Sequence, residues 1–155
     1  MTNVSNDIRG VLIQVVGARL LLPNATIAEV LAYAPPEPVE NAPEWLLGRI
    51  RWRGWRLPLI AFARMTGISE ESAALGNKVL VLKALGGDPK LPYFALLTQG
   101  FPRLVTVTRE ELVADAAGGD LPSGVQARIL LKDDPALLPD LTAVESQIGE
   151  ALQAA

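Results

Sequence analysis

The sequence predicts an all-β fold, a barrel or a sandwich, for a single domain. Short runs rich in Val, Ile and Leu recur along the chain, and turn signals containing Gly or Pro separate them at intervals of about 8 to 12 residues. This pattern indicates roughly seven to ten strands. Half of the 155 residues are hydrophobic, and a chain of this length buries about 70% of its unfolded surface, so one domain with its own core is expected.

The N-terminal part of the chain predicts a hairpin followed by an extended connector. Residues 8–22 fit two strands joined at Gly17-Ala18. Residues 25–33 fit either a short helix or a strand, because periodicity does not separate the two in so short a run. Residues 34–43 contain four prolines, which fix φ and lack an N–H group, so an extended connector is expected there rather than a central strand.

The stretch 47–62, LGRIRWRGWRLPLIAF, predicts a second hairpin. Alternation along its first strand places two arginines on one side and two apolar residues on the other: Arg49 and Arg51 against Ile50 and Trp52. The hairpin therefore has an arginine-rich face and an apolar face, with Trp52 directed into the core.

The turn of this hairpin is expected at Arg53-Gly54, because glycine tolerates the positive φ that tight hairpins require. Trp55 follows the turn directly, and the pattern leaves its side open. Pro58 in the returning strand indicates an edge position or a bulge.

The remaining segments continue the β pattern and end in a helix. In order they predict a short helix at 70–77 ending at Gly76, strands at 78–85 and 93–100 around a turn of Gly86, Gly87 and Pro89, a strand at 103–108, a helical turn at 109–115, a loop at 116–124, a strand at 125–132, a pair of turns at 133–139 and a helix at 140–155. The final helix has one apolar face, made by Leu141, Val144, Ile148 and Leu152. Asp140 or Thr142 is expected to cap it.

The composition argues against an enzyme. The chain contains neither cysteine nor histidine, which removes thiolate and imidazole metal sites, nucleophilic pairs built on histidine, and the commonest general base. It also lacks the glycine-rich motifs that hold nucleotide phosphates. The adjacent carboxylates at 70–71, 110–111 and 133–134 lie in polar, turn-like stretches and are interpreted as solvated surface. We therefore expect no catalysis, no metal and no cofactor.

The same features indicate a cytoplasmic protein. The N-terminal residues 1–10 are mostly polar and do not resemble a secretory signal, and the absence of cysteine gives no hint of export. The longest apolar runs are far shorter than the roughly 20 residues that a membrane-spanning helix needs, so no direct membrane insertion is expected.

Charge leaves two interpretations of the arginine-rich hairpin. The net charge of −3 disfavours a polyanionic partner, yet five arginines and no acid lie between Glu44 and Glu70. One hypothesis is a small β-barrel that binds nucleic acid through 47–62, with tryptophans stacking on bases. Because alternation places Trp52 opposite to the arginines, a protein partner is favoured and no nucleic-acid partner is expected; arginine and tryptophan are enriched at protein interfaces.

The order of residues in this hairpin also resembles the signature of CheW-like domains, the coupling proteins of bacterial chemotaxis arrays. The resemblance is carried by Gly48, Ile50, Arg53-Gly54 and the run Leu57-Pro58-Leu59-Ile60, preceded by the proline-rich stretch. Residues 80–107 are similar to the family's second lobe, and 136–148 to its closing strand and helix. The resemblance covers 8–150 as one domain of two lobes and leaves 1–7 as a flexible N-terminus. It implies two small SH3-like five-stranded barrels packed together, with short helices and a C-terminal helix.

The resemblance implies a non-catalytic adaptor that couples a methyl-accepting chemoreceptor, through its hairpin tip, to a CheA-type histidine kinase. Carried over to this sequence, the partner-contacting positions are Ile27, Glu29, Gly48, Arg53 and Gly54. Gly48 would permit a close backbone approach, Arg53 would offer paired donors, and Glu29 would supply a countercharge. The alternative for Arg53 is that it only orders the hairpin turn, and the alternative for Ile27 is that it is a core residue.

Two further stretches refine this resemblance. PYFALLTQGFPRL and LPDL are most similar to the ChpC branch, which accompanies the chemosensory pathway of type IV pili and twitching motility. Ala61 and Gln99 depart from the family pattern, since each stands where the family commonly has aspartate. They are consistent with an accessory or divergent coupler.

Overall fold

The computed structural model describes residues 8–69, 77–87, 89, 91–108, 112–114, 121, 124–131 and 134–154. Within these residues the strands are β1 (Ile8–Val15), β2 (Ala18–Pro23), β3 (Ile27–Ala32), β4 (Leu46–Trp52), β5 (Trp55–Ile60), β6 (Lys78–Lys83), β7 (Tyr93–Thr98), β8 (Arg103–Val107), β9 (Leu112–Ala114), β10 (Val125–Leu131) and β11 (Asp134–Pro139). The helices are the 3-10 turn η1 (Asn24–Thr26), α1 (Phe62–Met65) and α2 (Leu141–Ala154).

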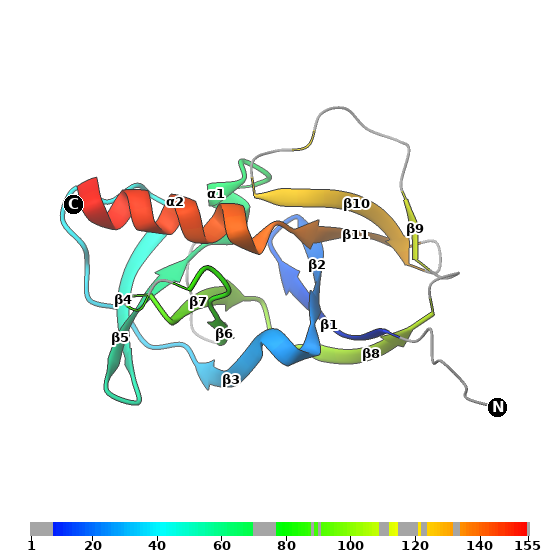
Figure 1. Ribbon diagram of the computed structural model, residues 1–155, viewed down its shortest axis with the longest axis horizontal. Coiled ribbons are helices and arrows are strands. Elements are labelled where there is room, and N and C mark those ends of the chain that lie inside the picture. The colour runs from blue at the N-terminus through cyan, green and yellow to red at the C-terminus, as the bar shows by residue number, and fades with distance from the viewer. Residues whose placement is uncertain are drawn as a thin grey trace.

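The strands form two sheets, which makes the molecule two-lobed (Figure 1). One sheet has the order β8-β1-β2-β11-β10-β9, and the other has the order β3-β6-β7-β5-β4. Helix α2 follows β11 and extends from the six-stranded sheet toward β4 of the other sheet, so it lies along both lobes (Figure 1). The predicted all-β class, two-lobed architecture and C-terminal helix are confirmed; the six-stranded sheet gains the short β9 at its edge.

Both faces of each sheet contribute residues to buried clusters, which explains why several strands are apolar without interruption. The inner faces of the two sheets and α2 form a central core, to which Ile13, Leu22, Leu80, Phe94 and Ile148 belong. The opposite face of the five-stranded sheet encloses two smaller clusters: Leu59, Val79, Ala95 and Leu97 in one, and Trp52, Leu57 and Val81 in the other. The opposite face of the six-stranded sheet encloses Leu21, Ile129 and Ala136. Successive residues of one strand therefore enter different cores.

Helix α2 has the cap and the apolar face that the sequence predicts. The Asp140 carboxylate accepts a hydrogen bond from the Ala143 N–H at 3.1 Å, which satisfies one of the free donors of the first turn. Val144 and Ile148 are fully buried in the central core, and Leu141 and Leu152 pack against it while partly exposed.

Glu145 anchors α2 to the five-stranded lobe. Its side chain is buried, and Oε1 accepts hydrogen bonds from the backbone N–H groups of Leu85, at 2.6 Å, and Gly86, at 3.1 Å, in the connection between β6 and β7. We expect Glu145→Ala to lower the free energy of unfolding by about 1–3 kcal/mol, because two donors lose their partner. Glu145→Gln, which keeps an acceptor oxygen, should lose less. Equilibrium urea denaturation of both variants measures this, and equal losses would contradict the anchoring role.

The segment similar to the second lobe, 80–107, is divided between the two sheets. β6 and β7 belong to the five-stranded sheet, whereas β8 pairs antiparallel with β1, with Val11 opposite Leu104. The expectation of one lobe for this segment is therefore wrong. The reason is that β1 presents two edges, and β8 supplies the partner for the edge that β2 leaves open.

Local assignments around the turns also need correction. The first turn lies at Val16-Gly17 rather than Gly17-Ala18, since Val15 pairs with Ala18. The alternatives for 25–33 are settled as η1 and strand β3. The helical turn predicted at 109–115 is wrong in its centre, where β9 pairs with β10. Most of the helix predicted at 70–77, most of the loop at 116–124 and all of 1–7 lie outside the described residues.

At two strands, β5 and β11, the structure differs from what their prolines predict. Residues 134–139 form β11 instead of turns, because its ladder to β2 joins only Leu137 to Leu20, away from the prolines at either end. β5 is not an edge strand, since it lies between β4 and β7. Its parallel pairing with β7 begins at Leu59, after Pro58, and the expected bulge falls in the partner strand between Leu46 and Gly48.

Candidate functional site

The turn of hairpin β4–β5 holds an arginine in a conformation that arginine rarely adopts. Trp52 pairs with Trp55, which leaves Arg53 and Gly54 as a two-residue turn with φ of +47° and +81°. Both φ values are positive, as in a type I′ turn, where asparagine and glycine are preferred. An L-residue with a Cβ costs about 1–2 kcal/mol in this region. A strained arginine at an exposed tip points to a use for its guanidinium.

The guanidinium of Arg53 is held by groups from two strands. Its Nη2 lies 3.0 Å from Oε1 of Glu29 on β3, and its central carbon lies 4.9 Å from the centre of the Trp52 ring. The indole N–H of Trp52 donates to the same Glu29 oxygen at 3.3 Å. Because β3 and β4 are opposite edges of the five-stranded sheet, these contacts bridge its two edges. The Arg53 side chain remains 70% exposed, so the pair adds little stability and stays accessible to a partner.

The two tryptophans that flank the turn differ in burial. Trp52 is buried with Leu57 and Val81 and meets the Tyr93 ring edge-on at 4.8 Å, which confirms the predicted core position. Trp55, as its cross-strand partner, lies on the same face but beyond the core, and it is 42% exposed. Alternation alone does not place Trp55, but a turn at 53–54 makes residues 52 and 55 cross-strand partners and therefore predicts that both side chains lie on the same face.

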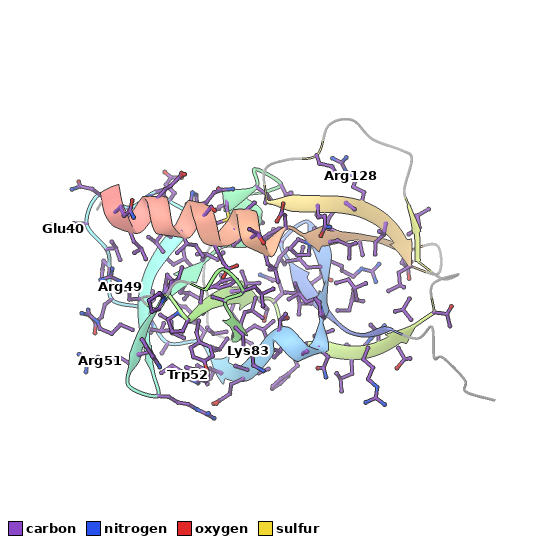
Figure 2. All side chains as sticks on the ribbon, in the orientation of Figure 1. Glu40, Arg49, Arg51, Trp52, Lys83 and Arg128 are labelled. Carbon is purple, nitrogen blue, oxygen red and sulfur yellow. The ribbon has the colours of Figure 1, made fainter. Side chains whose placement is uncertain are left out.

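The other face of the hairpin carries a second cluster around Glu37. Arg51 and Arg56 are directly opposite each other, and both contact the Glu37 carboxylate; the Arg51 Nε to Oε1 distance is 3.3 Å. Figure 2 shows Arg49 and Arg51 on the outer side of the hairpin and Trp52 on the side that faces β3. Glu37 offsets the repulsion between two like charges at a cross-strand pair. The hydrogen bond from Arg56 and its charge, with a smaller contribution from Arg51, hold the pKa of Glu37 below its ordinary value of 4.5.

This shift gives a pH dependence. Because the folded state lowers the pKa of Glu37, its contribution to stability is present above pH 4.5 and is lost as the pH falls through the folded-state pKa. We expect Glu37→Gln to be less stable than the unsubstituted protein at neutral pH, and the difference to shrink as the pH drops below 4.5. Urea denaturation of both proteins across this range measures it. A difference that is unchanged at low pH would contradict the role of the Glu37 charge.

Gly48 is required by the protein's own connector. It is buried with φ of +146°, and a Cβ there would lie 2.3 Å from the backbone oxygen of Glu37. Glu37 and Arg49 exchange two backbone hydrogen bonds of 2.8 Å, so the proline-rich connector runs along the edge of β4. The close backbone approach expected at Gly48 is thus already made, by residues 36–37.

The structure gathers three of the five carried-over residues. Glu29, Arg53 and Gly54 lie together at the hairpin tip. Ile27 is partly buried, packs against the central core and precedes a bulge in β3. Gly48 lies farther along β4, beneath the connector.

Comparison with known proteins identifies the family. A family model for the CheW-like domain matches residues 9–148, nearly the whole chain. The chain belongs to the CheW-like domain family. The crystal structure of the scaffolding protein TtCheW from Thermoanaerobacter tengcongensis is similar, with a TM-score of 0.71 and 15% sequence identity over 86% of this chain and 84% of that chain. This similarity confirms the predicted fold of two SH3-like lobes. No curated protein sequence gave a match.

CheW-like domains belong to a family of chemotaxis scaffolds, so a scaffold or adaptor role is the function that membership supports. In the part of this CheW-like domain that the structure describes, acidic residues do not gather into a group of three that could hold a metal ion. Over the same part, no helix is both long and apolar enough to cross a bilayer.

Proposed function

We propose that this CheW-like protein is a cytoplasmic, non-catalytic adaptor that couples the hairpin tip of a chemoreceptor to a CheA-type histidine kinase. Family membership supports the adaptor class. The observation that carries the proposal is the exposed Arg53, strained in its turn and held over Trp52 by Glu29. Arginine and tryptophan are the residues that most often dominate binding energy at protein interfaces.

Of the five carried-over positions, Glu29, Arg53 and Gly54 form the proposed contact surface, to which we add Trp55, while Ile27 and Gly48 lie behind it. Arg53 presents donors to carboxylates or carbonyl groups of the partner, and Trp55 supplies apolar area beside it. Gly54 has open space where a side chain would lie, so a partner backbone has room to approach the turn. Gly48 and Ile27 support this surface from within, since one seats the connector and the other packs into the core.

The hairpin is poorly suited to binding single-stranded nucleic acid. Such binders present several aromatic rings to the bases. Here Trp52 is buried, and the arginines at 51, 53 and 56 each face a carboxylate. If nucleic acid were the partner, its affinity would fall steeply with salt because counterions are released.

The test is the substitution Arg53→Asn, since asparagine tolerates the turn conformation and removes the guanidinium. We expect the free energy of unfolding to change by less than about 1 kcal/mol, while the affinity for the receptor tip or the kinase falls about tenfold or more. The matched control is Arg51→Asn, which removes the same charge from the opposite face of the hairpin. Binding is measured by pull-down and titration at low and moderate salt, using the kinase and receptor fragments of the same bacterium.

Two results would contradict the proposal. Unchanged binding by Arg53→Asn together with lowered stability would assign Arg53 to the structure alone. Retention of nucleic acid only, released by moderate salt, would favour the nucleic-acid hypothesis.

We further propose that the pathway served is the chemosensory system of type IV pili, on the resemblance of PYFALLTQGFPRL and LPDL to the ChpC branch. Deletion of the gene should then reduce twitching on a surface and leave flagellar swimming intact. The reverse pattern would place the protein in a flagellar array.

A further inference from the structure

The five-stranded sheet leaves an open seam between its two edge strands. β3 and β4 are the edges of this sheet, and at one end they are joined through Glu29, Trp52 and Arg53. Beyond that contact lies an open pocket of about 240 Å³, which we call the β3–β4 seam. It is lined by Leu31, Ala32, Ala34, Pro35, Glu37, Arg49, Ile50, Arg51 and Val79.

One side of the seam is an unpaired strand edge. The Tyr33 N–H donates to the Asn77 carbonyl at 3.2 Å, which directs the backbone groups of Tyr33, and of alternate residues before it, toward β6. The N–H and C=O groups of Val30 and Ala32 therefore point away from β6, and Ala32 is one of the residues that line the seam. Within the described residues β3 pairs with β6 alone, so these groups have no strand partner. An edge of this kind accepts an added strand.

The opposite side shows that an extended segment fits at such an edge. The connector residue Glu37 already pairs with Arg49 through two backbone hydrogen bonds, in the manner of an added strand. The seam thus has one edge that the connector covers and one that the described residues leave open.

The lining has a definite chemical character. Leu31, Ile50 and Val79 are apolar, and the first two pack, partly exposed, over the buried cluster that contains Val79. The rim is basic, since it carries two arginines, Arg49 and the 81% exposed Arg51, and one acid, Glu37. Glu37 contacts both Arg51 and Arg56, which lies outside the lining. Among the described residues Arg49 has no ion pair.

We propose that the β3–β4 seam binds an extended, acidic peptide segment of a partner protein, which adds a strand to the edge of β3. Backbone hydrogen bonds to Val30 and Ala32 align the segment, its apolar side chains cover Leu31 and Ile50, and its carboxylates meet Arg49 and Arg51. This site differs in position and ligand from the hairpin tip around Arg53, and it does not depend on the receptor or kinase contact.

The probe is a display library of short linear peptides, selected on the full-length protein. We expect the selected peptides to alternate apolar and acidic residues. A synthetic peptide of the selected sequence, labelled with fluorescein, is then titrated by fluorescence anisotropy. Its binding should slow hydrogen exchange at the amides of Val30 and Ala32.

Matched variants separate backbone pairing from other contacts. Ala32→Pro removes an N–H that the ladder to β6 does not use and should weaken binding about tenfold, whereas Ala32→Val should change it less than about twofold. Arg49→Glu should also weaken binding about tenfold. Arg53→Asn should leave peptide binding unchanged, so the two proposals succeed or fail separately.

A second measurement leaves the protein unaltered. Every second residue of an added strand directs its N–H toward β3. Methylation of the peptide nitrogens that face β3 should therefore abolish binding, whereas methylation of the nitrogens in between should not. The proposal is overturned if the library yields no binder, if selected peptides are basic or helical, or if Ala32→Pro and peptide methylation leave affinity unchanged.

Discussion

Replacing Trp52 with alanine is expected to lower the free energy of unfolding by about 3–5 kcal/mol. The ring is buried with Leu57 and Val81 and packs edge-on against Tyr93, so its removal opens a cavity that the surrounding sheet can fill only in part. Loss of the indole N–H also removes one of the two groups that hold Glu29. Since domains of this size are stable by only about 5–15 kcal/mol, the variant should unfold at a much lower urea concentration.

Trp55→Ala is the matched control. It removes the same side chain from the neighbouring cross-strand position, where the ring is 42% exposed, and it should lower stability by less than about 1 kcal/mol. Equilibrium urea denaturation of both variants provides the comparison. Equal losses would mean that the tryptophans do not differ in burial, whereas reduced partner binding by Trp55→Ala at normal stability would support its place on the proposed contact surface.

Gly48→Ala is expected to be the other severe substitution, because backbone strain and overpacking together should lower the free energy of unfolding by about 3–5 kcal/mol. Its φ of +146° disfavours any residue with a Cβ, and the added carbon would lie 2.3 Å from the backbone oxygen of Glu37. Either the connector moves away from β4, losing its two backbone hydrogen bonds to Arg49, or the strand distorts.

The control for Gly48 is Gly54→Ala. Gly54 also has positive φ, +81°, but no atom of the described residues lies within 4 Å of an added Cβ, so only backbone strain of about 1–2 kcal/mol is expected. Denaturation curves and hydrogen exchange at the Glu37 and Arg49 amides distinguish the two. Equal losses for the two substitutions, with both amides still protected, would show that the contact with Glu37 is not what requires glycine at position 48.

The sequence predicted features that depend on neighbouring residues. In the hairpin β4–β5, alternation and the Arg53-Gly54 turn are local properties, and they correctly placed Trp52 in a core. The face and cap of α2 follow in the same way from spacing and from Asp140. The family signature lies in one such local stretch, which is why the two-lobed fold could be expected before any pairing was known.

Only the tertiary structure decided which distant segments meet. Whether β8 pairs with β7 or with β1 depends on which strand edges remain open. The residues of β8 alone therefore do not predict its partner strand. The prolines of β11 predict turns, yet the segment is a strand. Its ladder to β2 joins only Leu137 to Leu20, and this limit is set by long-range register that the local sequence does not show. Likewise, Glu29 and Glu37 reach opposite faces of one hairpin only because β3 and the connector fold against it, and that arrangement creates both the Arg53 site and the β3–β4 seam.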